Sequence, residues 1–219
     1  MLLKGPGKWE HFHLYVILDV FSRYVVGWML AARESAELAK ELIAATCDKE
    51  AIVPEQLTLH ADRGTSMRSK SVALLLSDLG ITKSHRRPHV SDDNPFSESQ
   101  FKTLKYQPDF PVRFDSMEHA RAFCQKFFAW YNHEHRHSGI GYMTPAAMHT
   151  GQAIVLYAAR QAVLEQAFGK YPERFKHRLP QPPALPTMVG INLPKPTQEQ
   201  DNAHPNFDSK LLQAVSQSS

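Results

Sequence analysis

Residues 12–30 read FHLYVILDVFSRYVVGWML, and this run constrains the fold more than any other part of the chain. It is rich in β-branched and aromatic residues, and only a Ser-Arg pair breaks it. Such a composition predicts two adjacent strands joined by a tight turn at Phe21–Arg23. The core of the protein is therefore expected to open with a β-hairpin.

Helical and strand patterns alternate after this hairpin. Apolar residues at helical spacing predict a helix over 34–51, and a second helix over 69–80 has Ser69 as a plausible N-cap and Gly80 as a plausible C-cap. Short strands are expected over 57–62 and 81–86. Further helices are expected over 97–106, 116–135, 144–151 and 153–169. This order predicts an α/β fold with a mixed sheet flanked by helices.

The chain divides into three segments by composition. Residues 1–152 hold the alternating pattern and are expected to form one core domain, and residues 153–176 a C-terminal helical extension. Six of the 15 prolines fall between Pro180 and Pro196, and a polar end follows. Residues 177–219 are therefore expected to be a disordered or extended tail.

Charge, cysteine content and hydropathy limit the class of protein to which the chain can belong. A net charge of +3 permits nucleic-acid binding but does not argue for it, so any basic surface must be local. Cys47 and Cys124 are far apart and lie in apolar helical patterns, which favours buried free thiols in a reducing cytosol. No apolar run approaches the roughly 20 residues of a membrane span. A cytoplasmic, nucleoid-associated protein with no membrane contact is expected.

Two acids are positioned to share a metal ion. Asp62 ends the strand LTLHAD, and Glu98 opens the helix that follows the next strand, with 35 residues between them. Strand ends and helix starts face the same rim of an α/β sheet, and a helix N-terminus favours a carboxylate. Asp62 and Glu98 are therefore predicted to hold hard divalent cations through oxygen.

The helix that begins near Glu98 also carries two lysines on the same face. Glu98, Lys102 and Lys105 are spaced i, i+4 and i+7. A carboxylate above two lysines suits a metal site with a phosphate backbone alongside it. Taken alone, the three residues also fit an ordinary solvated face with a Glu–Lys pair. Their combination with Asp62 favours the metal site.

Four segments together resemble the integrase-type transposases of bacterial insertion sequences, which are relatives of retroviral integrases. The segments are ILDVFSRYVVGW, LHADRG, NPFSESQFKTLK and WYNHEHRHSGIGYMTP, and the resemblance covers roughly residues 8–150. It implies a ribonuclease-H-like core with an Asp, Asp, Glu metal triad, of which Asp62 is the second acid and Glu98 the third. It also implies Mg²⁺ or Mn²⁺, two ions in an intact site, and DNA strand cleavage and strand transfer.

The resemblance extends to the DNA contacts and the partners. Lys102 and Lys105 match positions that contact DNA ends in the family, and Arg136 belongs to the signature Tyr131, Asn132, Arg136, His137. Arg86 and Arg87 precede the loop SDDNP, where either DNA contact or a solvated turn is expected. The expected partners are transposon ends and target DNA, with a homo-oligomer on the DNA.

The first acid of the triad is the point where this sequence departs from the family. Asp19 lies in VILDVFSR, but family members carry the first acid one strand earlier. LLKGPGKW resembles the stretch that follows that strand, so the chain is expected to start a few residues too late. Asp19 is then either a structural acid near the turn, paired with Arg23, or a substitute metal ligand. The strand HLYVILD becomes an edge strand unless residues 2–10 replace the lost partner.

Three rival interpretations remain at this level. The chain is a catalytically inactive fragment that binds DNA or a full-length transposase, or it is a nuclease of the ribonuclease H type acting on RNA–DNA hybrids. The third concerns His133, His135 and His137 alone, which either bind zinc or form a helix end with backbone or phosphate contacts.

Overall fold

The structure is a computed structural model that describes residues 1–55, 57–61, 69–85 and 95–190. Three strands form an antiparallel sheet in the order β1 (Leu2–Lys4), β2 (His11–Leu18) and β3 (Val25–Ala31). Two more strands, β4 (Thr58–Ala61) and β5 (Thr82–His85), pair in parallel. The predicted hairpin is confirmed as β2 and β3, and the mixture of parallel and antiparallel pairs agrees with the predicted α/β class.

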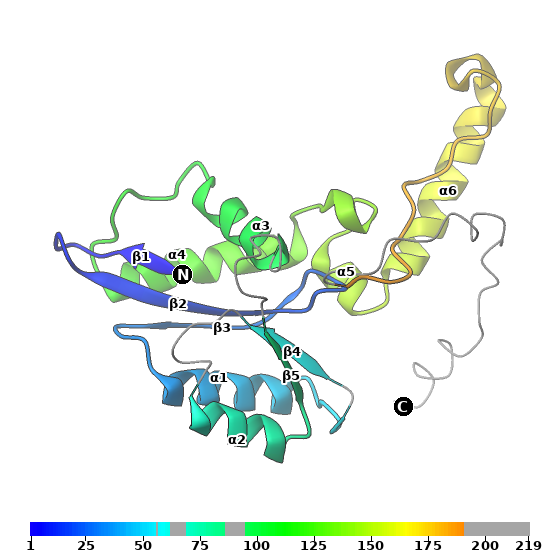
Figure 1. Cartoon of the computed structure of the whole chain (residues 1–219). Coiled ribbons are helices and arrows are strands. Elements are labelled where there is room, and N and C mark those ends of the chain that lie inside the picture. Colours follow the sequence, from blue (N-terminus) through cyan, green and yellow to red (C-terminus); the bar gives the residue numbers. More distant parts are fainter. Residues whose placement is uncertain (56, 62–68, 86–94, 191–219) are drawn as a thin grey trace.

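Helices cover both sides of the strands (Figure 1). On one side lie α1 (Ala36–Lys49) and α2 (Lys70–Asp78), and on the other lie α3 (Pro95–Lys105) and α4 (Met117–His133). The short helix α5 (Pro145–His149) follows, and α6 (Ala153–Lys170) projects away from the body (Figure 1). Two 3-10 turns complete the described elements, at Ser138–Ile140 and Pro172–Phe175.

Side-chain caps explain where several helices begin. Ser69 accepts a hydrogen bond from the Val72 amide, and Ser116 accepts one from the His119 amide. Each hydroxyl satisfies an amide that the first helical turn leaves without a partner. Gly80 follows α2 with φ of +62°, the left-handed conformation that favours glycine at a helix end. The predicted N-cap of α2 is therefore confirmed, while the predicted C-cap Gly80 lies one residue after the observed C-cap, Leu79.

Strand β1 is a separate strand that the sequence pattern did not indicate. Leu2–Lys4 pairs antiparallel with His11–His13, and the Met1 and Leu14 backbones exchange two hydrogen bonds of 2.8 Å. Residues 2–10 thus supply a partner for only the first part of β2. Among the described residues, no strand pairs with that edge of β2 beyond Leu14.

Two apolar clusters lie on the opposite faces of β2. Leu14 and Val16 face the cluster formed with α3 and α4, which includes the fully buried Tyr131 and Leu104. Tyr15 and Ile17 face a smaller cluster formed with α1 and α2. The alternation of side chains along a strand produces this division. Strand β2 therefore separates two cores.

The C-terminal part of the described chain packs lightly. In α6 only Ala153 is buried, and Ile154, Val155 and Val163 are exposed. Residues 178–190 contain no helix or strand, although Leu185 packs against the small cluster around Ile140 and Met143. Residues 191–219 of the predicted tail lie outside the described residues. No helix within the described ranges is long and apolar enough to cross a membrane.

Candidate active site

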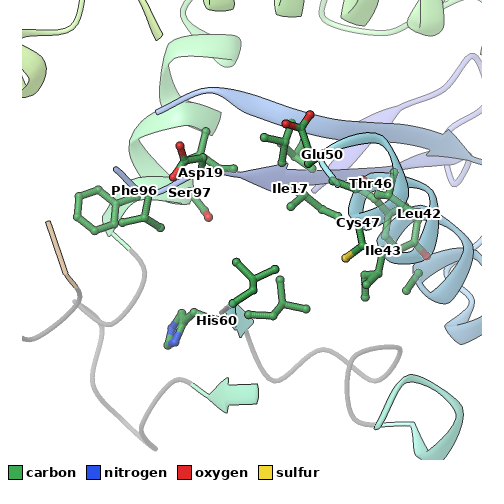
Figure 2. Close-up of a pocket in the computed structure, with 18 of the residues that line it drawn as sticks. Ile17, Asp19, Leu42, Ile43, Thr46, Cys47, Glu50, His60, Phe96 and Ser97 are labelled. Carbon is green, nitrogen blue, oxygen red and sulfur yellow. The ribbon is translucent and has the colours of Figure 1, made fainter. Parts of the chain in front are cut away.

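One cavity is lined by residues that lie close in sequence to the two predicted acids. It has a volume of about 750 Å³, and its rim holds Asp19 after β2, His60 in β4, and Phe96 and Ser97 at the start of α3 (Figure 2). His60 precedes Asp62 by two residues, and Ser97 immediately precedes Glu98. The fold therefore brings a close sequence neighbour of each predicted acid, His60 and Ser97, to the same cavity.

Glu98 itself is exposed in the first turn of α3. Its carboxylate forms no ion pair or hydrogen bond with any other described residue. The positive end of the helix dipole favours a negative charge at this position. Lys102 and Lys105 are exposed in the last turn, while Gln100 and Leu104 are buried on the inner face. This helix therefore presents an acid and two lysines to solvent, as its spacing predicted.

The remaining predicted basic residues and the second acid are not all described. Asp62, Arg86 and Arg87 lie outside the described residues. Arg136 is exposed, and its guanidinium donates a hydrogen bond of 3.4 Å to the Tyr142 carbonyl. The structure therefore leaves the assignment of these residues to DNA as a prediction.

Asp19 is engaged in a local network. Its Oδ1 accepts a hydrogen bond from the Phe21 amide at 3.0 Å, and its Oδ2 accepts hydrogen bonds from the Ser22 hydroxyl and from His149 Nδ1, the latter at 3.3 Å. Burial alone would raise the pKa of Asp19, but the hydrogen bonds from His149, Ser22 and Phe21 outweigh it and lower the pKa. This geometry favours the structural interpretation of Asp19.

The predicted pairing of Asp19 with Arg23 takes place through the backbone, because the Arg23 amide donates a hydrogen bond of 2.8 Å to the Asp19 carbonyl. Arg23 makes no salt bridge with Asp19; its guanidinium donates to the Val20 carbonyl at 2.7 Å and lies 3.8 Å from the centre of the Phe96 ring. The contact with Phe96 fastens the start of α3 to the turn after β2. Arg23 therefore positions the helix that carries Glu98.

His149 is the residue at this rim that sequence reasoning missed. Its Nε2 lies 3.1 Å from Glu50 Oε2, while its ring stacks on Tyr24 with 4.5 Å between centroids. The hydrogen bond to Asp19 is the largest cause that raises the pKa of His149, and Glu50 adds to it against the effect of burial. Because 130 residues separate His149 from Asp19 in sequence, no local pattern signals this contact.

The signature segment forms the end of α4. Asn132 accepts a hydrogen bond from the Val25 amide at 2.9 Å and donates one to the Val25 carbonyl at 3.1 Å. Tyr131 and His137 share a hydrogen bond of 2.9 Å, and burial lowers the pKa of His137 to about 4. These residues therefore hold α4 against β3 and the following turn. In the described chain, no group of three His, Cys, Asp or Glu side chains is arranged to hold a metal ion.

Matches to family models and to a solved structure identify the fold. Residues 2–91 and residues 79–145 each match a family model described as an integrase core domain. One chain of the simian T-cell lymphotropic virus intasome, solved in complex with the PP2A regulatory subunit B56 gamma, has a TM-score of 0.50 at 16% identity. That match covers 68% of this chain and 51% of the other. The fold is thus that of an integrase catalytic core, as the ribonuclease-H-like prediction required.

Two sequence relatives narrow the class further. The transposase for insertion sequence element IS904 of Lactococcus lactis is 32% identical over 141 residues, which are 64% of this chain and 55% of the relative. The transposase InsF for insertion sequence IS3A of Escherichia coli K12 is 29% identical over 134 residues, 61% of this chain and 46% of the relative. Over these residues the chain is similar to transposases of insertion sequences, and it spans about half the length of these curated relatives.

Proposed function

We propose that this chain acts on DNA in transposition, by metal-dependent cleavage and transfer of a DNA strand at the rim that carries Asp62 and Glu98. The observation that carries the proposal is the shared cavity, since His60 and Ser97, the close sequence neighbours of these two acids, both line it. Membership of the integrase core family, the exposed acid of α3 and its two lysines support the same function. The relatives named as transposases agree with it.

The carboxylates near the cavity decide whether a divalent cation fits there. The Glu98 carboxylate is exposed and has no partner among the described residues, so it is available as an oxygen ligand. Both oxygens of Asp19 already accept hydrogen bonds. The fit therefore rests on Glu98 together with Asp62, which we propose as the ligands of Mg²⁺ or Mn²⁺. When bound, such ions activate an attacking oxygen and stabilise the leaving oxygen in phosphodiester chemistry.

The protein residues supply binding and orientation. Lys102 and Lys105 place two positive charges on the face of α3 that also carries Glu98, so a phosphate backbone lying along that face meets both. We propose further phosphate contacts for Arg86, Arg87 and Arg136. The contact between Arg23 and Phe96 keeps α3 at the rim, so that Glu98 stays in position.

A second candidate function is DNA binding without cleavage, as an inactive transposase fragment. The network around Asp19 favours it, because it occupies an acid that would otherwise complete a triad at the rim. Binding requires only the basic residues, whereas cleavage also requires the proposed metal ligands Asp62 and Glu98. The two candidates therefore predict different results for the same variants.

The test is strand transfer of a labelled duplex carrying the terminal sequence of the element, with Mg²⁺ or Mn²⁺. The intact chain is expected to be active, and Glu98→Gln and Asp62→Asn should each lower the rate about a hundredfold or more. Asp19→Asn should retain measurable activity if Asp19 is structural. Loss of activity in Asp19→Asn, with an unchanged melting temperature, would instead make Asp19 a ligand. Cleavage of an RNA–DNA hybrid in place of the duplex would favour the ribonuclease H interpretation.

DNA binding is measured alongside by fluorescence anisotropy over a range of salt concentrations. Replacing both Lys102 and Lys105 by Ala should weaken binding and lower the salt slope by about one per lysine. Lys40→Ala, which removes an exposed lysine from α1, is the matched control and should leave both unchanged. Binding without cleavage under every metal condition would establish the second candidate. Absence of DNA binding would refute both.

A further inference from the structure

The net positive charge of the chain is concentrated in one short segment. Residues 170–178 read KYPERFKHR and hold four Lys or Arg and one Glu, so their net charge of +3 equals that of the whole chain. The chain has 25 Lys or Arg and 22 Asp or Glu in all, so the other 210 residues hold equal numbers, 21 of each. We call residues 170–178 the basic tip.

The basic tip lies at the far end of an arm. Helix α6 runs away from the body for 18 residues, about 27 Å at 1.5 Å per residue, and the tip turns the chain back at its end (Figure 1). The segment that follows returns to the base of α6 (Figure 1). The match to the integrase core models ends at residue 145, before the arm begins. The function proposed for the core therefore leaves this arm unexplained.

Both sides of the arm are fastened at its base. The Arg160 guanidinium donates hydrogen bonds to the Gly141 carbonyl at 2.8 Å and to the Tyr142 carbonyl at 2.9 Å. On the returning side, a β-carbon built on Gly141 would lie only 3.0 Å from the Pro183 carbonyl oxygen, and Leu185 packs against buried residues of the same turn. These contacts hold the tip at a set distance from the body.

The tip itself is a hydrogen-bonded turn. The His177 amide donates to the Pro172 carbonyl at 3.1 Å, and the Arg178 amide donates to the Phe175 carbonyl at 3.0 Å. The Phe175 ring packs against Phe168 of α6, with 6.1 Å between centroids. The basic side chains are therefore presented by a folded turn at the end of a helix.

The cations of the tip are available to bind an anion. All four are exposed: Lys170, Arg174, Lys176 and Arg178. Within the described residues none of the four forms an ion pair, and only the Arg174 side chain has a partner, the Tyr171 ring, at 4.9 Å. Lys176 and His177 adopt φ of +49° and +56°, a conformation that costs less with glycine. The turn thus keeps basic residues at positions where its backbone favours another residue.

We propose that the basic tip binds the phosphate backbone of duplex DNA, beyond the stretch that lies along α3. This inference rests on the proposed function, which places DNA on the face of α3 with Lys102 and Lys105. The arm follows α5, whose His149 contacts Asp19 at the rim of the cavity. An arm of about 27 Å is shorter than one turn of B-DNA, about 34 Å, so one duplex can reach both surfaces.

The chemistry of the tip suits phosphates better than base edges. Each DNA strand carries one negative charge per roughly 3.4 Å, so four cations within nine residues can meet several phosphates. Such contacts position a protein on the duplex but carry no sequence information. The tip is therefore expected to strengthen binding to any duplex of sufficient length, whatever its base sequence.

The first test measures how duplex binding by the full chain depends on salt, using fluorescence anisotropy in EDTA so that no metal contributes. The tip variant combines four substitutions: Lys170→Gln, Arg174→Gln, Lys176→Gln and Arg178→Gln. Each phosphate contact contributes about 0.9 to the slope of log Kobs against log salt, so the slope should fall by about two to four. Melting temperatures check that the variant folds.

A control variant removes the same charge from exposed positions elsewhere: Lys8→Gln, Arg33→Gln, Lys40→Gln and Arg121→Gln. It has the same net charge as the tip variant, so it separates a local contact from the overall charge. Its slope should equal that of the wild type. A wild-type slope in the tip variant, or an equal fall in both variants, would overturn the proposal.

The second test locates the tip on the DNA. His177→Cys keeps all four cations and adds an exposed thiol, whereas the two native cysteines are buried. An iron chelate attached there generates hydroxyl radicals and should cut the duplex at a discrete set of nucleotides. The same chelate on Tyr106→Cys, an exposed position at the end of α3, should cut a different set. Cuts from position 177 spread evenly along the DNA would contradict the proposal.

Failure of this inference differs from failure of the proposed function. If replacing Lys102 and Lys105 lowers the salt slope while the tip variant keeps it, the inference is wrong and the proposed function stands. If strand transfer is absent but the tip variant lowers the slope, the inference stands, because the binding assay needs no cleavage. A wild type that does not bind the duplex would refute both.

Discussion

At the scale of single residues, the ionised groups at the rim are held by one another. His149 lies between Asp19 and Glu50, with its two ring nitrogens 3.3 Å and 3.1 Å from their carboxylates. These contacts connect the turn after β2, the end of α1 and helix α5. All three side chains are less than a third exposed, so solvent screens the interaction only in part. His149 is therefore expected to link folding stability to pH.

The sign of that link follows from the shifted pKa values. The pKa of His149 is raised in the folded state. Its contribution to the free energy of unfolding is therefore complete below the ordinary histidine pKa near 6.5, and it is lost as the pH rises through the folded-state pKa. The folded pKa of Asp19 is lowered, so its contribution is present above about 4 and is lost on further acidification. Urea unfolding between pH 5 and 8.5 measures this. The free energy of unfolding of His149→Gln should be lower than that of the wild type by on the order of 1 kcal/mol at the acidic end, and the difference should shrink as the pH rises.

A second histidine, His137, changes the stability with pH in the opposite direction, so its effect must be distinguished from that of His149. Burial lowers the pKa of His137 to about 4, so the folded state loses stability as the pH falls below about 6.5. The difference between the wild type and His149→Gln cancels this effect, because both proteins retain His137. His133→Gln, an exposed position, is the control. A wild-type minus variant difference that does not change with pH would contradict the role given to His149.

At the scale of elements, the contact between α1 and β3 depends on one glycine. A β-carbon built on Gly27 would collide with the hydroxyl of Thr46, which is buried in α1. The helix therefore approaches the strand more closely than a larger residue would allow. This approach matters for the site, because α1 lines the cavity and Glu50 directly follows its last residue.

Gly27→Ala is expected to destabilise the protein by about 1–3 kcal/mol, since overpacking forces the helix or the strand to shift. The double variant with Thr46→Ala should be more stable than the two single effects predict, by about 0.5 kcal/mol or more. Chemical unfolding of the four proteins measures this coupling. Gly169→Ala, which nothing lies near, should be neutral or stabilising. Simple additivity at Gly27 and Thr46 would refute the close contact.

At the scale of the whole molecule, the two cores are unequal. The cluster between the antiparallel strands, α3 and α4 contains large buried aromatic residues such as Tyr131, Phe127 and Phe114. The cluster beneath α1 and α2 is made of smaller residues and borders the cavity. In the described chain, β4 and β5 are hydrogen-bonded as strands only to each other. The half that contains α2, β4 and β5 should therefore be the less stable one.

Native-state hydrogen exchange should reveal this difference. Amides of α2 and β5 are expected to exchange through an opening of lower free energy than amides of α4, because fewer buried apolar groups resist it. Leu76 and Phe127 are suitable reporters, since each is buried in its own core. Equal opening free energies at low denaturant would show that the molecule unfolds as a single unit.

Much of the architecture was predictable because it rests on local signals. Ser69, Gly80 and Ser116 mark helix ends by short-range hydrogen bonds or backbone conformation, and the hairpin follows from β-branched composition. Glu98, Lys102 and Lys105 lie in one helix, α3, as predicted. In a helix, residues spaced i, i+4 and i+7 lie on the same face, so their relative positions follow from the sequence. By contrast, β1 is only three residues long and carries no recognisable periodicity.

The sequence by itself thus determined the order of the helices and of the strands from β2 on, the N-caps of α2 and α4, and the resemblance to integrase cores. Only the tertiary structure decided that His149 reaches Asp19 and Glu50, and that the Arg23 guanidinium lies over the Phe96 ring without an ion pair to Asp19. The physical reason is the range of the interactions. Local hydrogen bonds and periodicity act over a few residues, whereas packing brings together groups whose separation in sequence carries no information about their contact.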